Sequence, residues 1–219
     1  MVERILKEVI SGGQVGADQG GLLAAKENCF LIGGWAPKGY RTRNGNRPDI
    51  LRDIFFLKER ETLSYRHRTF ANVQDSDGTI LFCNDFGTAG IKCTKEAINF
   101  YKKPSYDVIT DMQTDDPQLD QRIFESIFEW IKIHKIKVLN VAGNSQPQPA
   151  MFTRSYRFFN GLFTFINEKQ GGTNERDSNG YAKKNAGRFD WRNSRRQKIR
   201  REQKQIRRDK DYENYAKHS

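Results

Sequence analysis

Five short apolar runs, separated by segments with helical spacing, constrain the fold of this chain more than any other feature. The runs lie at residues 5–10, 29–32, 79–83, 106–109 and 138–142. Most of them are bounded by glycine, asparagine or aspartate, which are typical of the loops around buried strands. Apolar runs that alternate with helical segments predict βαβ units around a buried parallel sheet.

The segments between these runs predict the helices that cover the sheet. Apolar residues recur at every fourth position from Leu119 to Ile131, which is the spacing of an amphipathic helix. Weaker patterns predict further helices over residues 22–26, 91–101 and 152–166. We therefore expect an α/β fold over residues 1–169, with a doubly wound, mostly parallel, Rossmann-like sheet.

Residues 170–219 differ in composition and predict a separate basic linker and tail. Residues 171–219 hold 15 Lys and Arg against 7 Asp and Glu, so they carry +8 of the formal net charge of +11. The run at 193–210 contains good helix formers, but Ile199 and Ile206 are its only apolar residues. Such a segment buries too little surface to fold alone, so we expect it to be largely unfolded or a solitary helix.

The charge of this tail allows two interpretations. Lys and Arg can bind nucleic acid by releasing its condensed counterions. Four aromatic residues flank the basic run and suit single-stranded nucleic acid, namely Phe189, Trp191, Tyr212 and Tyr215. Alternatively, the tail is a solvated segment that only keeps the protein soluble.

Composition also excludes several classes of protein. No run approaches the roughly eighteen apolar residues that a membrane span needs, so we expect no membrane partner. The first residues carry charges within any apolar stretch, unlike a secretory signal. The three cysteines form no C-x-x-C pair, which argues against a disulfide framework or a zinc site and favours buried, inert thiols. We therefore expect a cytoplasmic protein.

Three glycine-bearing loops follow predicted strands and are candidates for a ligand site. The first spans residues 11–18, the second 84–90 and the third 142–145. In an open parallel sheet, ligands bind beyond the carboxyl ends of the strands. Glycines let backbone N–H groups approach an anion, and a helix that begins there adds its dipole. The alternatives are a tight strand-to-helix turn for the first loop and a helix cap for Asn144.

Residues 33–45 add a basic loop near this predicted site. Lys38, Arg41 and Arg43 bring three cations, and Trp35 offers a ring for stacking. A basic loop beside glycine loops favours a phosphorylated ligand over a neutral one. The alternative is an exposed basic loop without a ligand.

The sequence offers no assembled catalytic set, so catalytic residues are unassigned. His67 and His134 have no evident acid or metal partner, and no G-x-S-x-G or H-E-x-x-H motif occurs. Asp75 and Asp77 could hold Mg²⁺ against a phosphate. An Asp-Ser-Asp-Gly string more often forms a turn, so we assign no metal ligands.

Six collinear motifs run through residues 5–166. They are 10–18, 34–39, Arg68-Thr69 with Asn72-Val73, 75–79, Gly87-Thr88 and 139–143. In this order they resemble the molybdenum carrier family of the SLOG superfamily of Rossmann-like proteins. The resemblance implies a doubly wound α/β fold and a homo-oligomer. It also implies a small ligand that is the molybdenum cofactor or another nucleotide-like, phosphate-bearing molecule.

The resemblance implies a ligand site over the first loop, the Trp-Pro-Lys-Gly loop and the Gly-Thr loop. The predicted ligand-binding residues are Gly12, Gly13, Gln14, Gly16, Asp18, Trp35, Pro37, Lys38, Gly39, Arg41, Gly87, Thr88 and Asn144. Two positions depart from related proteins. The family usually has Arg after the Asp of the first motif, where this chain has Gln19. Related phosphoribohydrolases carry a catalytic Glu three residues after Gly-Thr, where this chain has Ile91, which argues against that hydrolysis.

The sequence thus supports three hypotheses of function. The first is a binding protein that carries or sequesters a phosphate-bearing, nucleotide-like ligand, because the glycine loops come without a catalytic set. The second is an enzyme that acts on a nucleotide or phosphosugar, with Asp18, Asp75 or Asp77 as general base or metal ligand. The third is a nucleic-acid-associated protein that binds through residues 171–219. The first and third hypotheses use different parts of the chain and are compatible.

Overall fold

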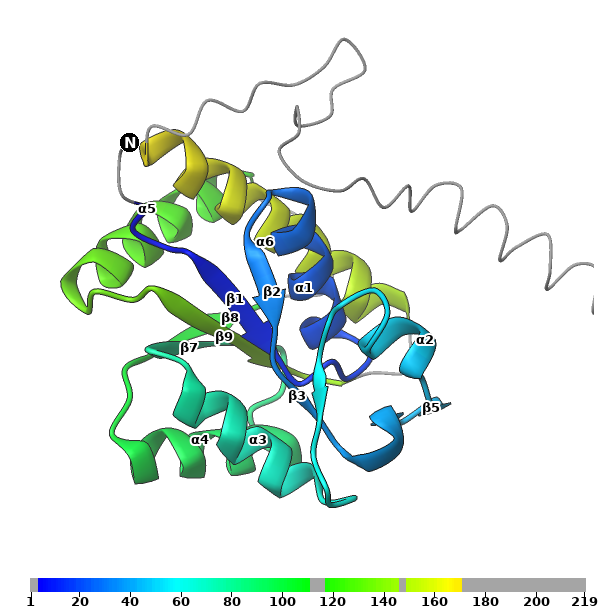
Figure 1. Ribbon diagram of the computed structural model, residues 1–219. Coiled ribbons are helices and arrows are strands. Elements are labelled where there is room, and N and C mark those ends of the chain that lie inside the picture. Colours follow the sequence, from blue (N-terminus) through cyan, green and yellow to red (C-terminus); the bar gives the residue numbers. More distant parts are fainter. Residues whose placement is uncertain (1–3, 111–116, 146–148, 171–219) are drawn as a thin grey trace, which may run out of the picture. The chain divides into compact units, whose positions relative to one another are not determined.

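A computed structural model describes residues 4–110, 117–145 and 149–170 (Figure 1). The predicted basic tail lies outside the described residues, so its structure and the domain boundary after residue 169 remain predictions. The strands are β1 (Glu8–Ser11), β2 (Leu31–Gly33), β3 (Trp35–Ala36), β4 (Arg41–Thr42), β5 (Gly45–Asn46), β6 (Lys58–Glu59), β7 (Gly78–Cys83), β8 (Ser105–Ile109) and β9 (Val138–Gly143). The helices are α1 (Ala17–Glu27), the 3-10 helix η1 (Lys38–Tyr40), α2 (Pro48–Leu51), α3 (Tyr65–Asp75), α4 (Ala89–Tyr101), α5 (Pro117–Ile133) and α6 (Pro149–Lys169). None of the described helices is long and apolar enough to cross a membrane.

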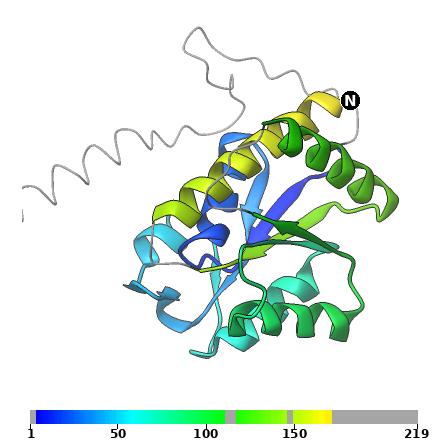
Figure 2. The same ribbon diagram turned by 180° about the vertical axis from the view of Figure 1, so that it is seen from behind.

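Five strands form one sheet in the order β2-β1-β9-β7-β8, and every pair in it is parallel. Each of the five apolar runs contributes one of these strands. Helices lie on both faces of the sheet, as two opposite views show (Figure 1 and Figure 2). The predicted doubly wound, Rossmann-like α/β fold is therefore confirmed.

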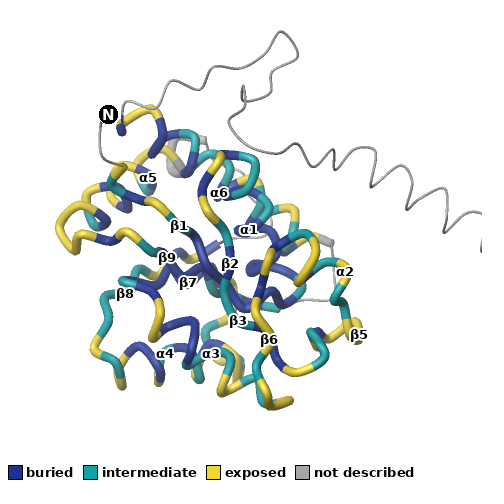
Figure 3. The backbone as a smooth tube through the Cα atoms, viewed as in Figure 1, coloured by how far each residue is buried: buried dark blue, intermediate teal, exposed yellow. Residues whose placement is uncertain are grey.

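Two apolar cores cover the two faces of this sheet. Along β7, Ile80 and Phe82 pack into the core that α1, α5 and α6 share, whereas Leu81 and Cys83 pack against α3 and α4. All residues of β7 are buried, as expected of a central strand in a parallel sheet. Figure 3 shows the same pattern, with burial concentrated on the central strands and exposure on the outer turns of the helices.

Glycines in α1 let this helix pack closely against its neighbours. A Cβ atom on Gly20 would lie 1.9 Å from Ser155 Oγ and 2.8 Å from the carbonyl oxygen of Phe152, both in α6. A Cβ atom on Gly21 would lie 2.6 Å from Cγ1 of Val141 in β9. This close packing fixes the start of α1, and with it the glycine loop that precedes α1.

The last of the described strands, β9, lies at the centre of the sheet. If β9 is numbered first and is followed by β1, β2, β7 and β8, the strand order across the sheet becomes 3-2-1-4-5. This is the order of doubly wound nucleotide-binding folds. Leu6 N donates a hydrogen bond to Oε1 of Gln170 at 2.8 Å, so the start of β1 and the end of α6 meet. Within the described residues, the domain is therefore a Rossmann-like fold in which the segment before β1 contacts the end of α6.

The segment between β2 and β7 contains elements that the apolar runs did not predict. Its short strands pair in two small ladders, β3 with β6 and β4 with β5, and strands of two residues leave no periodic pattern. A third apolar cluster joins this segment to α1, and its buried members are Leu22, Ala36, Leu51, Phe55 and Leu57. Helix α3 was also missed, because Ala71, Asn72 and Val73 are its only buried residues.

Candidate functional site

The carboxyl ends of β1, β9 and β7 bring the three predicted loops together. These strands are neighbours in the sheet, so the loops at 11–18, 143–145 and 84–88 follow one another along one edge. The backbone joins two of them directly, because Ala17 N donates a hydrogen bond to the carbonyl oxygen of Asn144 at 3.3 Å. We call these segments the carboxyl-edge loops.

Asn144 ties the loop after β9 to the loop after β7. Its Oδ1 accepts hydrogen bonds from Asn84 N at 2.8 Å and from Asp85 N at 3.0 Å. Its Nδ2 donates to the carbonyl oxygen of Asp85 at 2.7 Å and to Oγ1 of Thr88 at 3.3 Å. The side chain is only 3% exposed. Asn144 therefore positions the loop that carries Thr88.

The loop after β7 leads directly into α4. Gly87 is exposed, and its N–H donates a hydrogen bond to Oδ1 of Asp85 at 2.7 Å. Thr88 is the N-cap residue of α4, whose first turn contains no acidic residue. The positive end of the helix dipole therefore lies at this edge, and the carboxylate of Asp85 is the anion nearest along the chain.

The first loop is closed by its own side chains. Gln14 N donates to Oδ2 of Asp18 at 3.1 Å, and Val15 N donates to Oε1 of Gln14 at 3.1 Å. Gln19, which stands where the family usually has Arg, donates from Nε2 to the carbonyl oxygen of Gly13 at 3.0 Å. Two backbone N–H groups of the predicted anion cradle thus already have acceptors within the loop.

A buried ion pair lies over this loop. Nη1 of Arg68, from α3, donates to Oδ2 of Asp18 at 3.1 Å, and the two side chains are 12% and 6% exposed. A Cβ atom on Gly12 would lie 1.4 Å from Nη1 and 2.2 Å from Cζ of Arg68, so only glycine leaves room for the guanidinium. Nε of Arg68 is buried and has no hydrogen-bond partner within the described ranges. Arg68 thus brings a cation with an unused donor to the glycine loop.

Burial raises the pKa of Asp18 above its ordinary value, because desolvation disfavours the carboxylate. The charge of Arg68 and the N–H of Gln14 act in the opposite direction without cancelling this effect. Asp18 therefore takes up a proton more readily than an exposed aspartate. If Arg68 moved away from Asp18, the pKa of Asp18 would rise further, because the positive charge of Arg68 lowers it.

Gly13 and Gly16 serve the local backbone and its packing. Gly13 has a φ of 69°, and a Cβ atom there would lie 2.7 Å from a methyl carbon of Leu51 and of Leu57. Gly16 has a φ of 106° and immediately precedes α1. Gly13 therefore allows the segment between β2 and β7 to pack on the first loop, independently of any ligand.

Trp35 of β3 is held by α3. Asn72 Oδ1 accepts a hydrogen bond from Trp35 N at 2.9 Å, and its Nδ2 donates to the carbonyl oxygen of Trp35 at 3.1 Å. Trp35 Nε1 donates to Oδ2 of Asp75 at 2.7 Å. The cations of Arg60 and Lys58 lie 5.0 and 5.6 Å from the centre of the indole. The ring predicted to stack on a ligand already stacks with these two side chains.

Arg43 links the basic loop to two carboxyl-edge loops. Its Nη1 donates to the carbonyl oxygen of Ser145 at 3.1 Å, and its backbone N–H donates to Oε1 of Gln14 at 2.9 Å. The guanidinium carbons of Arg41 and Arg68 lie 5.8 and 5.9 Å from the centre of the Tyr65 ring. The basic loop thus reaches the predicted site.

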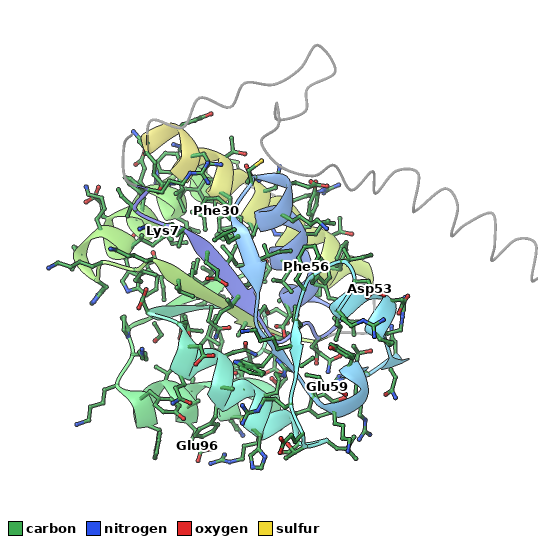
Figure 4. The ribbon with its side chains drawn as sticks, in the orientation of Figure 1. Lys7, Phe30, Asp53, Phe56, Glu59 and Glu96 are labelled. Atoms are coloured by element: carbon green, nitrogen blue, oxygen red, sulfur yellow. The ribbon has the colours of Figure 1, made fainter. Side chains whose placement is uncertain are left out.

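The Pro-Lys-Gly turn has mainly backbone roles. Pro37 is buried and accepts a hydrogen bond from Tyr40 N at 2.9 Å. Gly39 has a φ of 74°, and its N–H donates to the carboxylate of Glu59, a residue labelled in Figure 4. Lys38 is exposed. Of these three predicted residues, Lys38 alone presents a charged side chain to solvent.

Asp75 and Asp77 make contacts in different directions. Asp75 accepts from the indole of Trp35, whereas Oδ2 of Asp77 accepts from Lys137 N and Val138 N at 2.9 and 2.8 Å, at the start of β9. Across the part of the chain that the structure describes, no three His, Cys, Asp or Glu residues gather as metal ligands. The two carboxylates therefore do not fit a shared Mg²⁺ ion.

The three cysteines have different surroundings. Cys83 is buried, and burial raises the pKa of its thiol to about 12, as predicted for an inert thiol. Cys93 is half-buried. Cys29 is exposed, so the prediction of a buried thiol is wrong there, because the strand begins only at Leu31.

This fold, with glycine loops at the carboxyl edge of a parallel sheet, defines a Rossmann-like α/β protein. The circularly permutated YpsA SLOG family matches residues 9–163, and the chain belongs to that family. The family resemblance is thus confirmed, and the permutation agrees with the central position of β9.

A solved structure is similar over the same region. It is a putative molybdenum carrier protein from Syntrophus aciditrophicus, with 30% sequence identity and a TM-score of 0.63. The match covers 73% of this chain and 96% of that chain. No curated protein matches the chain.

The predicted set of ligand-binding residues did not include Tyr65, Arg68 or Asp85, which lie at this site. Arg68 stood in a recognised motif, but its partner Asp18 lies 50 residues earlier in the chain, so the ion pair left no local signal. Tyr65 and Asp85 belong to none of the recognised motifs and only lie close to Arg68 and Gly87 in the sequence. The topology, rather than any spacing, brings them to the glycine loops.

Proposed function

We propose that this protein binds a phosphate-bearing, nucleotide-like ligand at the carboxyl-edge loops and carries or sequesters it. The observation that carries this proposal is the Arg68–Asp18 ion pair over Gly12, because it brings a buried cation to a glycine loop. Arg41 and Arg68 both lie over the ring of Tyr65, so Arg41 supplies a second guanidinium at the site. The N-terminus of α4 adds a favourable dipole for an anion.

In this proposal, a phosphate replaces two internal carboxylates. Asp18 now accepts from Arg68 and Gln14 N, and Asp85 accepts from Gly87 N. Phosphate oxygens have the same acceptor chemistry and can take over these donors. The raised pKa of Asp18 favours the exchange, since its carboxyl can take up a proton once Arg68 turns to the ligand.

The name of the solved relative supports the molybdenum cofactor as the ligand, and other nucleotide derivatives share its phosphate. The enzyme alternative has less support. Ile91, at the position of the hydrolase glutamate, is apolar and 1% exposed. Asp75 accepts a hydrogen bond from the indole of Trp35, and Asp77 accepts hydrogen bonds from the backbone at the start of β9. We therefore propose binding without turnover, whereas the enzyme alternative predicts turnover that Asp18→Asn abolishes.

Isothermal titration calorimetry with matched ligands tests the proposal. Nucleoside monophosphates and phosphorylated pterins are compared with their dephosphorylated forms. We expect measurable heat only with the phosphate, and at least tenfold weaker binding in Arg41→Gln. Arg52→Gln is the control, because Arg52 is exposed and pairs with Asp53 outside the site. Gly13→Asp is unsuitable, since its side chain would collide with Leu51.

A second candidate function rests on the charge of the tail. Residues 171–219 carry a net charge of +8, which favours nucleic acid as a partner. In the full chain, four arginines are changed to glutamine, namely Arg195, Arg196, Arg200 and Arg201. We expect weaker binding to a labelled oligonucleotide in fluorescence anisotropy and a shallower dependence on salt. Unchanged affinity would leave only the solubilising interpretation.

We also propose an oligomeric state and a cellular location for the protein. The family resemblance supports a homo-oligomer, which sedimentation equilibrium of the full chain measures. The unpaired pattern of cysteines supports a cytoplasmic protein, which fractionation of the source cells measures.

A further inference from the structure

An internal carboxylate occupies two of the donors at the first glycine loop. Nη1 of Arg68 and the backbone N–H of Gln14 both donate to Oδ2 of Asp18, each at 3.1 Å. Asp18 lies in the first turn of α1, and its side chain is 6% exposed. The cation from α3 and the N–H of the loop are therefore held by an anion that belongs to the protein itself.

This ion pair satisfies Arg68 only in part. Nη1 reaches Asp18, whereas Nε is buried and has no hydrogen-bond partner among the residues that the structure describes. A buried donor without an acceptor costs free energy. A guanidinium can present two parallel N–H groups to two oxygens of one phosphate, and a phosphate monoester has three such oxygens. The pair therefore leaves Arg68 with a donor that a phosphate can satisfy.

The ionisable groups around Asp18 come from α3 and from the sheet. Arg68 is the charge that acts most strongly on Asp18. The guanidinium carbons of Arg68 and Arg41 lie 5.9 and 5.8 Å from the centre of the Tyr65 ring. On the sheet side, Cys83 of β7 is a titratable neighbour. It stays a neutral thiol at neutral pH, because burial raises its pKa to about 12.

The other groups near Asp18 are neutral or have partners of their own. Backbone N–H groups of the first loop and of β9 favour its ionised form. The neutral hydroxyl of Ser155, from α6, donates to the carbonyl oxygen of Gly16 at 3.5 Å. Arg43 donates to a carbonyl oxygen in the loop after β9, and Asp85 accepts from an N–H of its own loop. The ionisation of Asp18 is therefore tied to the position of Arg68.

We propose that Asp18 is an autoinhibitory group of the ligand site, which holds Arg68 while it is ionised and releases Arg68 to a phosphate when it takes up a proton. This inference rests on the function proposed above and adds the regulation of the same site. The proton comes from solvent and forms an O–H bond on the Asp18 carboxylate, and no other covalent bond changes. A neutral carboxyl attracts the guanidinium less, so the phosphate takes over the cation and its unused Nε donor.

The proposal fixes the sign of a pH dependence. Burial already raises the pKa of Asp18 while Arg68 lies beside it. Transfer of Arg68 to a phosphate and the negative charge of that phosphate both raise this pKa further. Between the two pKa values of Asp18, the complex therefore binds one proton more than the free protein. Affinity for the ligand falls as pH rises through this range, by about tenfold per pH unit.

Calorimetric titration of the full chain with adenosine 5′-monophosphate measures this proton directly. At about pH 7.5 the free ligand is almost entirely a dianion, since the second pKa of such a phosphate is about 6. The titration is repeated in buffers with different enthalpies of ionisation, because the observed heat varies with that enthalpy in proportion to the protons taken up. We expect the wild type to take up about half to one proton per ligand.

Two matched variants assign the proton to Asp18. Asp18→Asn keeps the size of the side chain but cannot ionise, so it should bind at least about tenfold more tightly than the wild type at pH 8 and take up no proton. Asp53→Asn removes the same charge outside the site, where Asp53 is exposed and pairs with Arg52 (Figure 4). This control should keep the affinity and the proton uptake of the wild type. A direct contact between Asp18 and the ligand predicts the opposite, namely weaker binding by Asp18→Asn.

Heat that does not vary with buffer in the wild type would overturn the inference while the proposed function stood. Weaker binding by Asp18→Asn, or proton uptake equal to that of the wild type, would have the same consequence. Absence of heat in both proteins, with the nucleotide and with a phosphorylated pterin, would overturn the proposed function as well. Urea denaturation confirms that folded variants are compared, and the wild-type measurement decides the question even if Asp18→Asn folds poorly.

Discussion

Arg68 Nη1 and Asp18 Oδ2 form an ion pair at 3.1 Å that joins α3 to the first turn of α1 directly over Gly12. The two side chains are only 12% and 6% exposed, so both charges are largely withdrawn from water. Removal of one partner from a buried pair leaves an uncompensated charge, which costs more than the pair itself contributes. The pair is therefore a sensitive point for both stability and ligand binding.

We expect Arg68→Met to lower the free energy of unfolding by about 3 kcal/mol at neutral pH, because the buried carboxylate of Asp18 loses its cation. Urea denaturation measures the loss. Arg66→Met on the same helix is the control, since Arg66 pairs with Glu96 at the solvent-exposed surface and its loss should change the stability much less. Equal losses in the two variants would contradict the structural role of the buried pair.

The raised pKa of Asp18 predicts a specific dependence of stability on pH. A carboxyl whose pKa is higher in the folded state stabilises the fold while it is protonated. Its contribution to the free energy of unfolding is therefore full below about pH 4 and is lost as pH rises through the folded pKa. Asp18→Asn should remove this component, as urea titrations between pH 4 and 8 would show. An unaltered pH profile in Asp18→Asn would refute it.

Gly20→Ala should destabilise the protein by about 2 kcal/mol, because the new methyl group would overlap Ser155 Oγ and the backbone of α6. Gly90→Ala is the matched control in α4, where no atom lies within 4 Å of the added Cβ. It should stabilise the protein by about 0.5 kcal/mol, since alanine reduces the freedom of the unfolded chain. Thermal and urea denaturation measure both. Similar changes in the two variants would argue against close α1–α6 packing.

Asn144→Ala should release the loop after β7, because all four hydrogen bonds of this side chain hold that loop. We expect a loss of about 3 kcal/mol and faster hydrogen exchange at the amides of Asn84 and Asp85. Asn84→Ala is the control, since Asn84 is exposed and Asn144 bonds only its backbone. Unchanged exchange in the Asn144 variant would show that the loop holds itself in place.

Much of this fold could be predicted, because buried parallel strands are continuous apolar runs that stand out from their surroundings. Each of the five runs became a strand of the sheet. The order of the strands could not be read from local patterns, since nothing in residues 138–142 reveals that β9 lies between β1 and β7. The ladders of two residues and α3, with little buried surface, also left no periodic signal.

The positions of the glycine loops could be predicted from the sequence. The structural roles of the individual glycines could be predicted only in part. Gly12 makes room for Arg68, and Gly13 makes room for Leu51 and Leu57, which are contacts between segments far apart in sequence. Asn144 was considered as a ligand contact or a helix cap, and it holds a neighbouring loop. Such roles depend on tertiary contacts, which a single sequence without its fold does not display.

Native mass spectrometry of the protein purified gently from cells tests the central claim most directly. We expect the wild type to carry one small adduct, and the molecule extracted from it to contain phosphate and a pterin or nucleoside group. The Arg41→Gln variant, purified in the same way, should lose that adduct while Arg52→Gln keeps it. An adduct without phosphate, or an apo protein that also gives no calorimetric response to any phosphorylated ligand, would contradict the claim.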